Sequence, residues 1–346
     1  PPALKEPNFP SLDHGCCSIL SCPLCLNHRP NVMNSNTAAI KISRDQLLKL
    51  QFPHLLCVRK RPLIEEEVTA KESDIITIAE GGVITVQDPN PKFSNKGNRS
   101  FCYDHTFDKT TSNDTLHNVT TRPLVQAIFE QGIACCLSYS ESSSGKTFTM
   151  AGNQPGETQD YSNGLYGLTA RDIVYLNLQL EVYASFFEVY CEKVLDLLNN
   201  NNELQARKDR CHHVDVAGLH EIKAACTGDV LKLIKLGQKF RTTCLTLVNK
   251  RSSRSHAVFQ LILRRQEELH GKLSLVDLVG CERATSARVD RQISLERTEI
   301  NKNLLALREC VRALGKGKFH ITFRDSKLTH IFEDFFTGSG QHHSPK

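Results

Sequence analysis

The feature that most constrains this chain is a polar loop that separates an apolar run from a stretch able to form a helix. The loop lies within SYSESSSGKTFTM at residues 138–150 and ends in Gly145, Lys146 and Thr147. The preceding run IACCLSY at 133–139 predicts a buried strand, and KTFTM can begin a helix. A strand, a loop ending in Gly-Lys-Thr and a helix are together typical of a phosphate-binding loop.

The chemistry of such a loop favours a polyphosphate with a magnesium ion. Inward-facing backbone N–H groups bind the phosphates, Lys146 would reach the outer ones, and Thr147 would offer its hydroxyl to Mg²⁺. The pattern G-x-x-x-x-G-K-[ST] requires Gly where this chain has Ser140. Ser140 and Ser143 keep their N–H donors but add a Cβ, at a cost of about 1–2 kcal/mol wherever φ is positive. Glu141 adds a negative charge. We therefore predict a degenerate phosphate loop with weakened affinity.

Length and composition bound the remaining possibilities. With 346 residues, the chain can hold one large α/β domain plus a flank, or two domains. No apolar run approaches the ~18 residues that a membrane span needs, so no membrane partner is expected. The 14 Cys are scattered and often lie in apolar runs, which favours reduced thiols of a cytoplasmic protein over a disulfide framework. Because the chain starts at Pro1 rather than Met, we treat it as a fragment.

The first 50 residues differ in composition from the rest. Residues 1–50 are rich in Pro, Ser, Asn and Cys without a sustained period, which predicts a linker or disordered arm before a globular domain at 51–346. Cys22 and Cys25, with further Cys nearby and His28, could form half a zinc site. No second pair follows at zinc-finger spacing, so unpaired thiols are the favoured alternative.

The globular part alternates between strand and helix patterns. This alternation predicts an α/β fold with a central, mostly parallel sheet and helices on both faces. A helix at 290–314 is expected from an apolar stripe that includes Ile300 and Leu304. The other expected elements are a strand at 55–63, a hairpin at 74–86 around Gly81-Gly82, a strand passing into a helix at 180–198, and two strands at 257–280 joined at His270-Gly271.

Two further stretches suit phosphate chemistry. DLVG at 277–280 ends an apolar run; Asp277 could hold Mg²⁺ through water, and the N–H of Gly280 could sense a γ-phosphate. NKRSSRSH at 249–256 offers hydroxyls and an arginine before the same hairpin. Each motif is common in isolation, but their order beside three predicted strands favours nucleotide binding.

These motifs resemble those of the kinesin motor domain. SSRSH at 252–256 and DLVGCE at 277–282 resemble its two switch motifs, VRKRP at 58–62 its adenine-side motif, and RDSKLT at 324–329 its tubulin-facing helix. CVRKRPL, TRPLVQAIFE, SRSHAVFQLILRR, LHGKLSLVDL and EINKNLLALRECVRALG are most similar to the internal-motor kinesins that depolymerise microtubules, such as mitotic centromere-associated kinesin. The resemblance covers roughly 55–337 and implies a P-loop NTPase-like fold, ATP with Mg²⁺ as cofactors, and a cytoplasmic, cytoskeletal location.

The resemblance also implies roles for individual residues. Arg254 and Glu282 match the salt bridge between the switches that positions the attacking water, with Ser252 and Ser253 closing on the γ-phosphate and its metal. The implied catalytic residues are Arg254, Glu282, Ser253 and Lys146, and the implied metal-binding residues are Thr147, Ser253 and Asp277. The implied ATP-binding residues are Ser140, Glu141, Ser142, Ser143, Ser144, Gly145, Lys146, Thr147, Phe148, Arg59, Arg61, Pro62 and Gly280, with Arg59, Arg61 and Pro62 bordering the adenine and Phe148 stacking on it.

The charge distribution indicates an acidic partner. Residues 281–330 contain eleven Lys and Arg against six Asp and Glu, a surplus of +5 that equals the net charge of the whole chain. One basic surface on an otherwise balanced chain suits an acidic polymer, although a solvated helix face is the alternative. Aromatic residues for base stacking are scarce here, so nucleic acid is not expected. In kinesins this region faces tubulin; the implied contacts are Arg283, Lys302, Arg308, Arg312, Lys316, Lys318, Arg324 and Lys327.

The chain also departs from the family pattern. The K-V-D finger of depolymerising kinesins is replaced by PKFSNKGNRS at 91–100. Where those kinesins have the tripeptide K-E-C, this chain has Arg308-Glu309-Cys310, which keeps the same charges. Family members continue past TGSGQHHSPK into a last strand, which inserts into the sheet interior, and a last helix. We therefore expect that strand and helix to be missing, leaving a slot with exposed ladder groups.

Two alternatives to an active motor remain. A degenerate paralogue would keep the fold plan and bind microtubules but bind or hydrolyse ATP poorly. A P-loop GTPase is disfavoured because the guanine-reading Asp of N-K-x-D is Ser252 here. Any homodimer would form through regions outside this chain.

Overall fold

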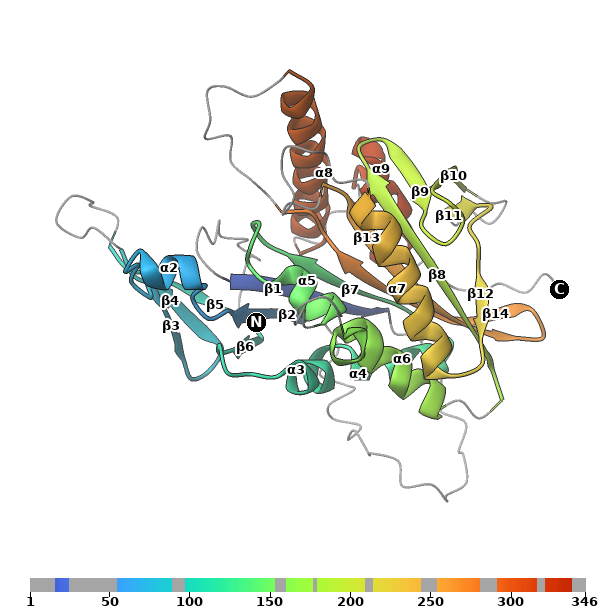
Figure 1. The fold of residues 1–346 in the computed structure, drawn as a ribbon, viewed down its shortest axis with the longest axis horizontal. Coiled ribbons are helices and arrows are strands. Elements are labelled where there is room, and N and C mark those ends of the chain that lie inside the picture. Colours follow the sequence, from blue (N-terminus) through green and yellow to red (C-terminus); the bar gives the residue numbers. More distant parts are fainter. Residues whose placement is uncertain are drawn as a thin grey trace.

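The computed structural model describes residues 16–24, 55–88, 97–152, 160–176, 179–208, 214–243, 254–280, 291–315 and 321–337 (Figure 1). In these segments, an 11-stranded sheet crosses the molecule and a separate 3-stranded sheet stands at one end. Helices lie on both faces of the large sheet. The expected α/β class is confirmed.

The strands of the large sheet pair in an order that brings distant segments together. In that order they are β11 (Val214–Ala217), β10 (Asn202–Lys208), β9 (Lys193–Asp196), β8 (Glu181–Tyr190), β13 (His256–Arg265), β14 (Glu268–Asp277), β7 (Ile133–Tyr139), β1 (Cys16–Leu24), β2 (Leu55–Lys60) and β6 (His105–Phe107), with β12 (Ile222–Ala224) paired to β8. The small sheet contains β3 (Ile76–Ala79), β4 (Val83–Val86) and β5 (Arg99–Cys102). The helices are α2 (Glu65–Thr69), α3 (Asn113–Thr120), α4 (Arg122–Phe129), α5 (Lys146–Ala151), α6 (Leu165–Leu176), α7 (Thr227–Thr243), α8 (Arg291–Gly315), α9 (Lys327–Ile331) and α10 (Glu333–Thr337).

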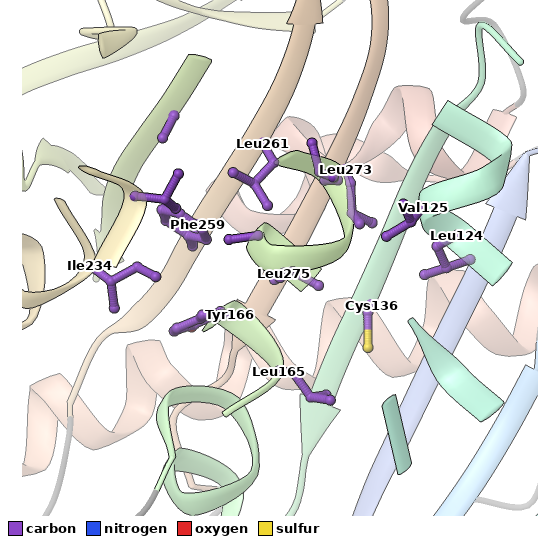
Figure 2. Close-up of a cluster of buried hydrophobic side chains, with 14 of the residues drawn as sticks. Leu124, Val125, Cys136, Leu165, Tyr166, Ile234, Phe259, Leu261, Leu273 and Leu275 are labelled. Atoms are coloured by element: carbon purple, nitrogen blue, oxygen red, sulfur yellow. The ribbon is translucent and has the colours of Figure 1, made fainter. Parts of the chain in front are cut away.

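One face of the sheet is covered by α3, α4, α6 and α7. Figure 2 shows the apolar cluster beneath them, in which Tyr166 of α6 and Ile234 of α7 approach Phe259 of β13. Strand β7 contributes Ala134 and Cys136 to this cluster and, because side chains alternate along a strand, Cys135 to the cluster on the opposite face. Burial on both faces explains why this strand reads as a continuous apolar run.

The opposite face is covered by α8, α9 and α10. The expected stripe of the long helix is buried there, with Ile300, Leu304, Leu307 and Val311 in one cluster with Val276 of β14. The helix at 290–314 is therefore confirmed as α8, Arg291–Gly315. Among the described helices, none has the length and apolar character needed to cross a membrane.

The sheet is mixed rather than mostly parallel, which corrects the sequence-based expectation. Among the described strands, parallel pairing occurs between β7 and β14 and between β2 and β6, while the other pairs are antiparallel. The antiparallel pairing of β13 with β14 has a local cause. Gln266 and Glu267 have φ of 49° and 70°, which forms a tight two-residue turn and forces antiparallel pairing.

Two local expectations were wrong and one was confirmed. The turn between β13 and β14 lies at Gln266 and Glu267, not at His270-Gly271. The segment 180–198 forms β8 and β9, not a strand and a helix, because Cys191 takes φ of 52° and reverses the chain. The hairpin at 74–86 is confirmed as β3 and β4.

The N-terminal arm requires the largest correction. Residues 16–24 are not part of a disordered linker: they form β1, which lies inside the large sheet between β2 and β7. The expected unfilled slot is consequently absent among the described strands, since β1 pairs on both sides. Cys25 and His28 of the suggested zinc half-site lie outside the described residues.

Candidate functional site

The phosphate loop connects β7 to α5, as the sequence predicts. Gly145 caps α5 with φ of 92°, and Lys146 begins the helix. The Lys146 ammonium is almost fully buried and donates to two carbonyl oxygens of its own loop, those of Ser140 at 3.1 Å and Glu141 at 2.6 Å. The loop thus satisfies its lysine internally, and a ligand must replace these two bonds.

Of Ser140 and Ser143, only Ser143 has a strained backbone. Ser143 adopts φ of 62°, in the left-handed region, whereas Ser140 is not among the residues with positive φ. A serine at the strained position costs about 1–2 kcal/mol relative to a residue without Cβ. Ser144 is buried, and its Oγ has no hydrogen-bond partner among the described residues. The loop therefore holds an unsatisfied polar atom suited to a polar ligand.

Asp277 meets the loop from β14. Strands β7 and β14 are parallel, with Asp277 opposite Ser138, so their carboxyl ends lie at the same edge of the sheet. Asp277 Oδ2 accepts from Thr147 Oγ1 at 3.0 Å, while Asp277 Oδ1 is buried without a partner among the described residues. A hydroxyl beside an unused carboxylate oxygen matches the ligands that Mg²⁺ prefers. These residues fit a magnesium ion.

Gly280 lies directly against the loop. A Cβ built on Gly280 would come within 2.4 Å of Ser142 Oγ and 2.7 Å of Ser142 N. Only glycine permits this close approach of the two backbones, since real Cβ contacts are never so short. The sequence predicts that the N–H of Gly280 senses a γ-phosphate, and the structure places Gly280 beside the phosphate loop.

Arg241 is a residue of the site that the sequence analysis missed. From the end of α7, its Nη1 donates to Asp277 Oδ2 at 2.7 Å and its Nη2 to the carbonyl oxygen of Ser255 at 3.1 Å. Burial alone would lower the pKa of Arg241, but the Asp277 carboxylate raises it above the ordinary value. An isolated arginine near the end of a helix carries no motif, so no sequence signal pointed to it.

The adenine-side residues fall into two groups. Arg59 is buried, donating from Nη1 to Thr149 Oγ1 at 3.1 Å and from Nη2 to the carbonyl oxygen of Thr111 at 2.7 Å. Its guanidinium lies 5.2 Å from the ring centroid of Phe148, which remains 44% exposed and can stack on a ligand. Arg61 instead forms two bonds to the Glu67 carboxylate of α2, at 2.5 and 2.7 Å. The exposed Pro62 follows it in the chain.

The structure describes part of the first switch motif and none of Glu282. Ser252, Ser253 and Glu282 lie outside the described residues, so the predicted bridge from Arg254 is not placed.

The end of the first switch motif is well packed. Ser255 Oγ donates to Glu188 Oε2 at 2.5 Å, and His256 Nδ1 accepts from the N–H of Val279 at 3.3 Å. Burial lowers the pKa of His256 to about 3, so its ring is neutral at physiological pH. The hydrogen bond between Val279 and His256 therefore links the SRSH motif to the DLVG motif.

The described basic residues of the expected tubulin face differ in exposure. Lys302, Arg312 and Arg324 are exposed, and Lys327 is partly buried. Lys302 lies 3.8 Å from Glu192 and Arg312 bonds Glu309 at 2.8 Å.

Arg308 points inward instead. It is partly buried, and its Nη2 donates to Tyr139 OH at 2.9 Å. Arg283, Lys316 and Lys318 lie outside the described residues.

A phosphate loop after a central strand and a carboxylate at the end of the adjacent parallel strand are typical of a P-loop nucleotide-binding domain. A family model for the kinesin motor domain matches residues 59–343, so the chain belongs to the kinesin motor domain family. Membership implies an ATP-driven motor that binds microtubules.

Two solved structures are similar to this chain. One is a KIF14 dimer, residues 391–772, in a two-heads-bound state with AMP-PNP in complex with a microtubule; it is 29% identical with a TM-score of 0.67, and the match covers 80% of this chain and 82% of that chain. The other is a fast kinesin, 28% identical with a TM-score of 0.67, where the match covers 80% of each chain.

Proposed function

We propose that this chain is an ATP- and Mg²⁺-dependent motor domain of the depolymerising kinesin class that couples ATP hydrolysis in the cytoplasm to microtubule binding or to microtubule depolymerisation. The observation that carries the nucleotide part is the meeting of Lys146, Thr147 and Asp277 at one edge of the sheet. An ammonium, a hydroxyl and a carboxylate in this arrangement are the groups that P-loop ATPases use to hold phosphates and magnesium.

Each residue has a distinct part in this proposal. Lys146 leaves the carbonyl oxygens of Ser140 and Glu141 and contacts the outer phosphates. Thr147, and Asp277 through water, would hold Mg²⁺, which when bound would offset the negative charge of the phosphates. Arg241 keeps the Asp277 carboxylate in place by donating to Oδ2, the oxygen that also accepts from Thr147.

The hydrolytic step would depend on the switch residues. In this proposal, Arg254 pairs with Glu282 and orients the attacking water, with Ser253 on the metal. Support comes from the next residues of the first switch motif, because Ser255 and His256 make buried hydrogen bonds. A positioned water and preorganised charge are what phosphoryl transfer requires.

A second candidate is the degenerate paralogue that binds microtubules but uses ATP poorly. The specific observation in its favour is the buried Lys146 ammonium, which already donates to the carbonyl oxygens of Ser140 and Glu141, so ATP must replace these hydrogen bonds. Glu141 adds a negative charge to a loop that must bind phosphates.

ATP titration of the purified chain, with and without Mg²⁺, tests the proposal and separates the two candidates. Lys146→Ala should abolish binding because it removes the phosphate contact, and Asp277→Asn should remove its Mg²⁺ dependence. Lys193→Ala, at an exposed lysine of β9 that pairs with Glu203, is the matched control and should bind like the parent. Binding too weak to saturate in the parent chain would favour the degenerate paralogue; equal binding by Lys146→Ala would refute the site.

Release of tubulin from stabilised microtubules tests the subclass. The altered stretch at 91–100 lacks the K-V-D tripeptide, so we expect the chain to pellet with microtubules while releasing little tubulin. Efficient release would show that the depolymerising activity does not need that tripeptide.

A further inference from the structure

Strand β1 occupies an unusual place for a segment near the start of the described chain. It is antiparallel to both of its neighbours, pairing residues 16–21 with β2 and residues 18–24 with β7. Figure 1 shows it inside the sheet, between the first strand of the globular part and the strand that leads to the phosphate loop. Helix α4 packs across it.

The neighbours of β1 need a strand at this position. Cys57 and Val58 of β2 are fully buried, as are Cys136 and Ser138 of β7. The edges of β2 and β7 that face each other pair with β1 and with no other described strand. Without β1, the N–H and C=O groups on these two edges would lose the partners that β1 supplies, at about 0.5–1.5 kcal/mol per hydrogen bond.

The connection between β1 and β2 is much longer in sequence than a hairpin loop. Antiparallel neighbours are normally joined by a hairpin loop of about 2–5 residues. Here Ser21 lies opposite Leu55, yet residues 25–54 separate the two strands in sequence. The register between β1 and β2 is therefore not set by a loop of hairpin length.

The sequence of the segment suits such a fit. CCSILSCPL is largely uncharged and apolar, as a strand in a sheet interior should be. Pro23, which lacks an N–H, falls beyond Ser21, the last residue paired with β2. A proline at the singly paired end of a strand leaves the doubly paired part, Ser18–Ser21, intact.

We propose that the slot between β2 and β7 is a strand-binding site whose ligand is this chain's own segment 16–24, bound as a separable β-strand. The ligand class is an extended, uncharged peptide recognised through its backbone, the mode known as β-strand addition. Because Ser18 lies opposite Tyr139, the bound strand supports the residue directly before the phosphate loop.

Cleavage of the connection tests separability. A protease site is inserted between Asn36 and Thr37 of the full chain, the chain is cut, and the pieces are passed through gel filtration without nucleotide. We expect the N-terminal piece to co-elute with the body in equal amounts and to leave only on unfolding in urea. Leu20→Pro, which removes an N–H within the doubly paired part, should release the piece, whereas Ser11→Pro, outside β1, should not. Release from the cut parent, or equal retention in both proline variants, would overturn the proposal.

The native cysteines test the register and the identity of the occupant. Cys22 and Cys135 are register partners. Antiparallel partners have Cα atoms about 4.5–5.5 Å apart, within the disulfide range of about 4.4–6.8 Å. Refolding in glutathione buffer, with Cys16, Cys17 and Cys25 changed to Ser, should link Cys22 to Cys135 as oxidised glutathione is reduced to two thiols.

A matched variant shifts the thiol by one position. Combining Ser21→Cys with Cys22→Ser in that background should move the link to Cys136, the register partner of position 21. Refolding a mixture of isotope-labelled and unlabelled chains shows whether the link is within one chain. Links to other cysteines, or links between chains, would overturn the assignment of the segment to its own slot. Since neither experiment uses nucleotide, both outcomes are independent of the proposed ATPase activity.

Discussion

Replacing Ser143 by glycine isolates the energetic effect of the left-handed backbone in the phosphate loop. Ser143 has φ of 62°, while the adjacent Ser144 is not among the residues with positive φ. The Ser144 hydroxyl has no hydrogen-bond partner among the described residues, so Ser144→Gly removes no hydrogen bond. The two adjacent serines therefore differ in backbone conformation, and they also differ in burial, since Ser143 is exposed and Ser144 is buried.

The expected magnitudes follow from two opposing effects. Ser143→Gly relieves about 1–2 kcal/mol of strain in the folded state. Each glycine also gives the unfolded chain more freedom, which destabilises the fold by about 0.5–1 kcal/mol. Ser143→Gly should thus raise the free energy of unfolding by about 0.5–1 kcal/mol, and Ser144→Gly should lower it by a similar amount.

ATP affinity should respond differently. The strain at Ser143 exists in the loop without ligand, so it is common to the unbound and bound states and cancels in the binding free energy. Ser143→Gly should therefore leave the Kd for ATP nearly unchanged. Glu141→Gln should tighten binding by about 1 kcal/mol, the repulsion between unit charges 4 Å apart in water.

Urea unfolding at constant pH and ATP titration of the three variants measure both quantities. The difference in unfolding free energy between Ser143→Gly and Ser144→Gly should be about 1–2 kcal/mol, because the entropic effect of glycine cancels between them. A smaller or reversed difference would refute the strain argument. A tenfold gain in ATP affinity from Ser143→Gly would show that the bound loop is more strained than the structure indicates.

Three further predictions follow from the site and its surroundings. Arg254→Ala, Glu282→Ala and the double variant should lose ATP turnover to a similar degree, because two residues that act as one unit are not additive; additive losses would contradict the bridge. Microtubule pelleting should weaken steeply between 0.1 and 0.5 M salt, whereas Lys302→Glu with Arg312→Glu should pellet less at 0.1 M and depend less on salt; salt-independent pelleting of the parent would contradict the basic-face argument. His256 has its pKa lowered to about 3 by burial, so the unfolded state takes up an extra proton as pH falls below the ordinary value of about 6.5 and stability is lost. The loss of unfolding free energy between pH 7 and 5 should be smaller by about 2 kcal/mol in His256→Gln than in the parent, and equal losses would contradict a neutral buried ring.

Sequence patterns predicted the parts of the fold whose signals are local. The strand before the phosphate loop, the hairpin at 74–86 and the buried stripe of α8 each follow from periodicity within one segment. Asp277 was expected near the loop because its motif ends a strand, and the parallel pairing of β7 with β14 brings it there. The order of the motifs along the chain was sufficient to predict that Asp277 lies near the phosphate loop.

Features that depend on distant contacts were not predictable in this way. The segment 16–24 is short, contains a proline and lies within a Pro- and Ser-rich stretch, so its strand depends on the neighbours that supply its hydrogen bonds. The segment 180–198 is an apolar run that periodicity cannot assign to strand or helix, and pairing with β13 decided it. Arg241 reaches Asp277 only because α7 ends beside β14, which no local pattern encodes.

Arg308 shows why a count of charges is a poorer guide than the surface itself. By sequence it belongs to the basic segment 281–330, yet its guanidinium donates to Tyr139 OH and is partly buried. Tyr139 is the last residue of β7, and Ser140 begins the phosphate loop. One charge of the segment is therefore engaged between α8 and the strand that leads to the loop, and is unavailable to an outside partner without breaking that bond. The exposed charges of Lys302, Arg312 and Arg324 are the ones on which an electrostatic contact can depend, and the salt dependence of pelleting should follow those residues.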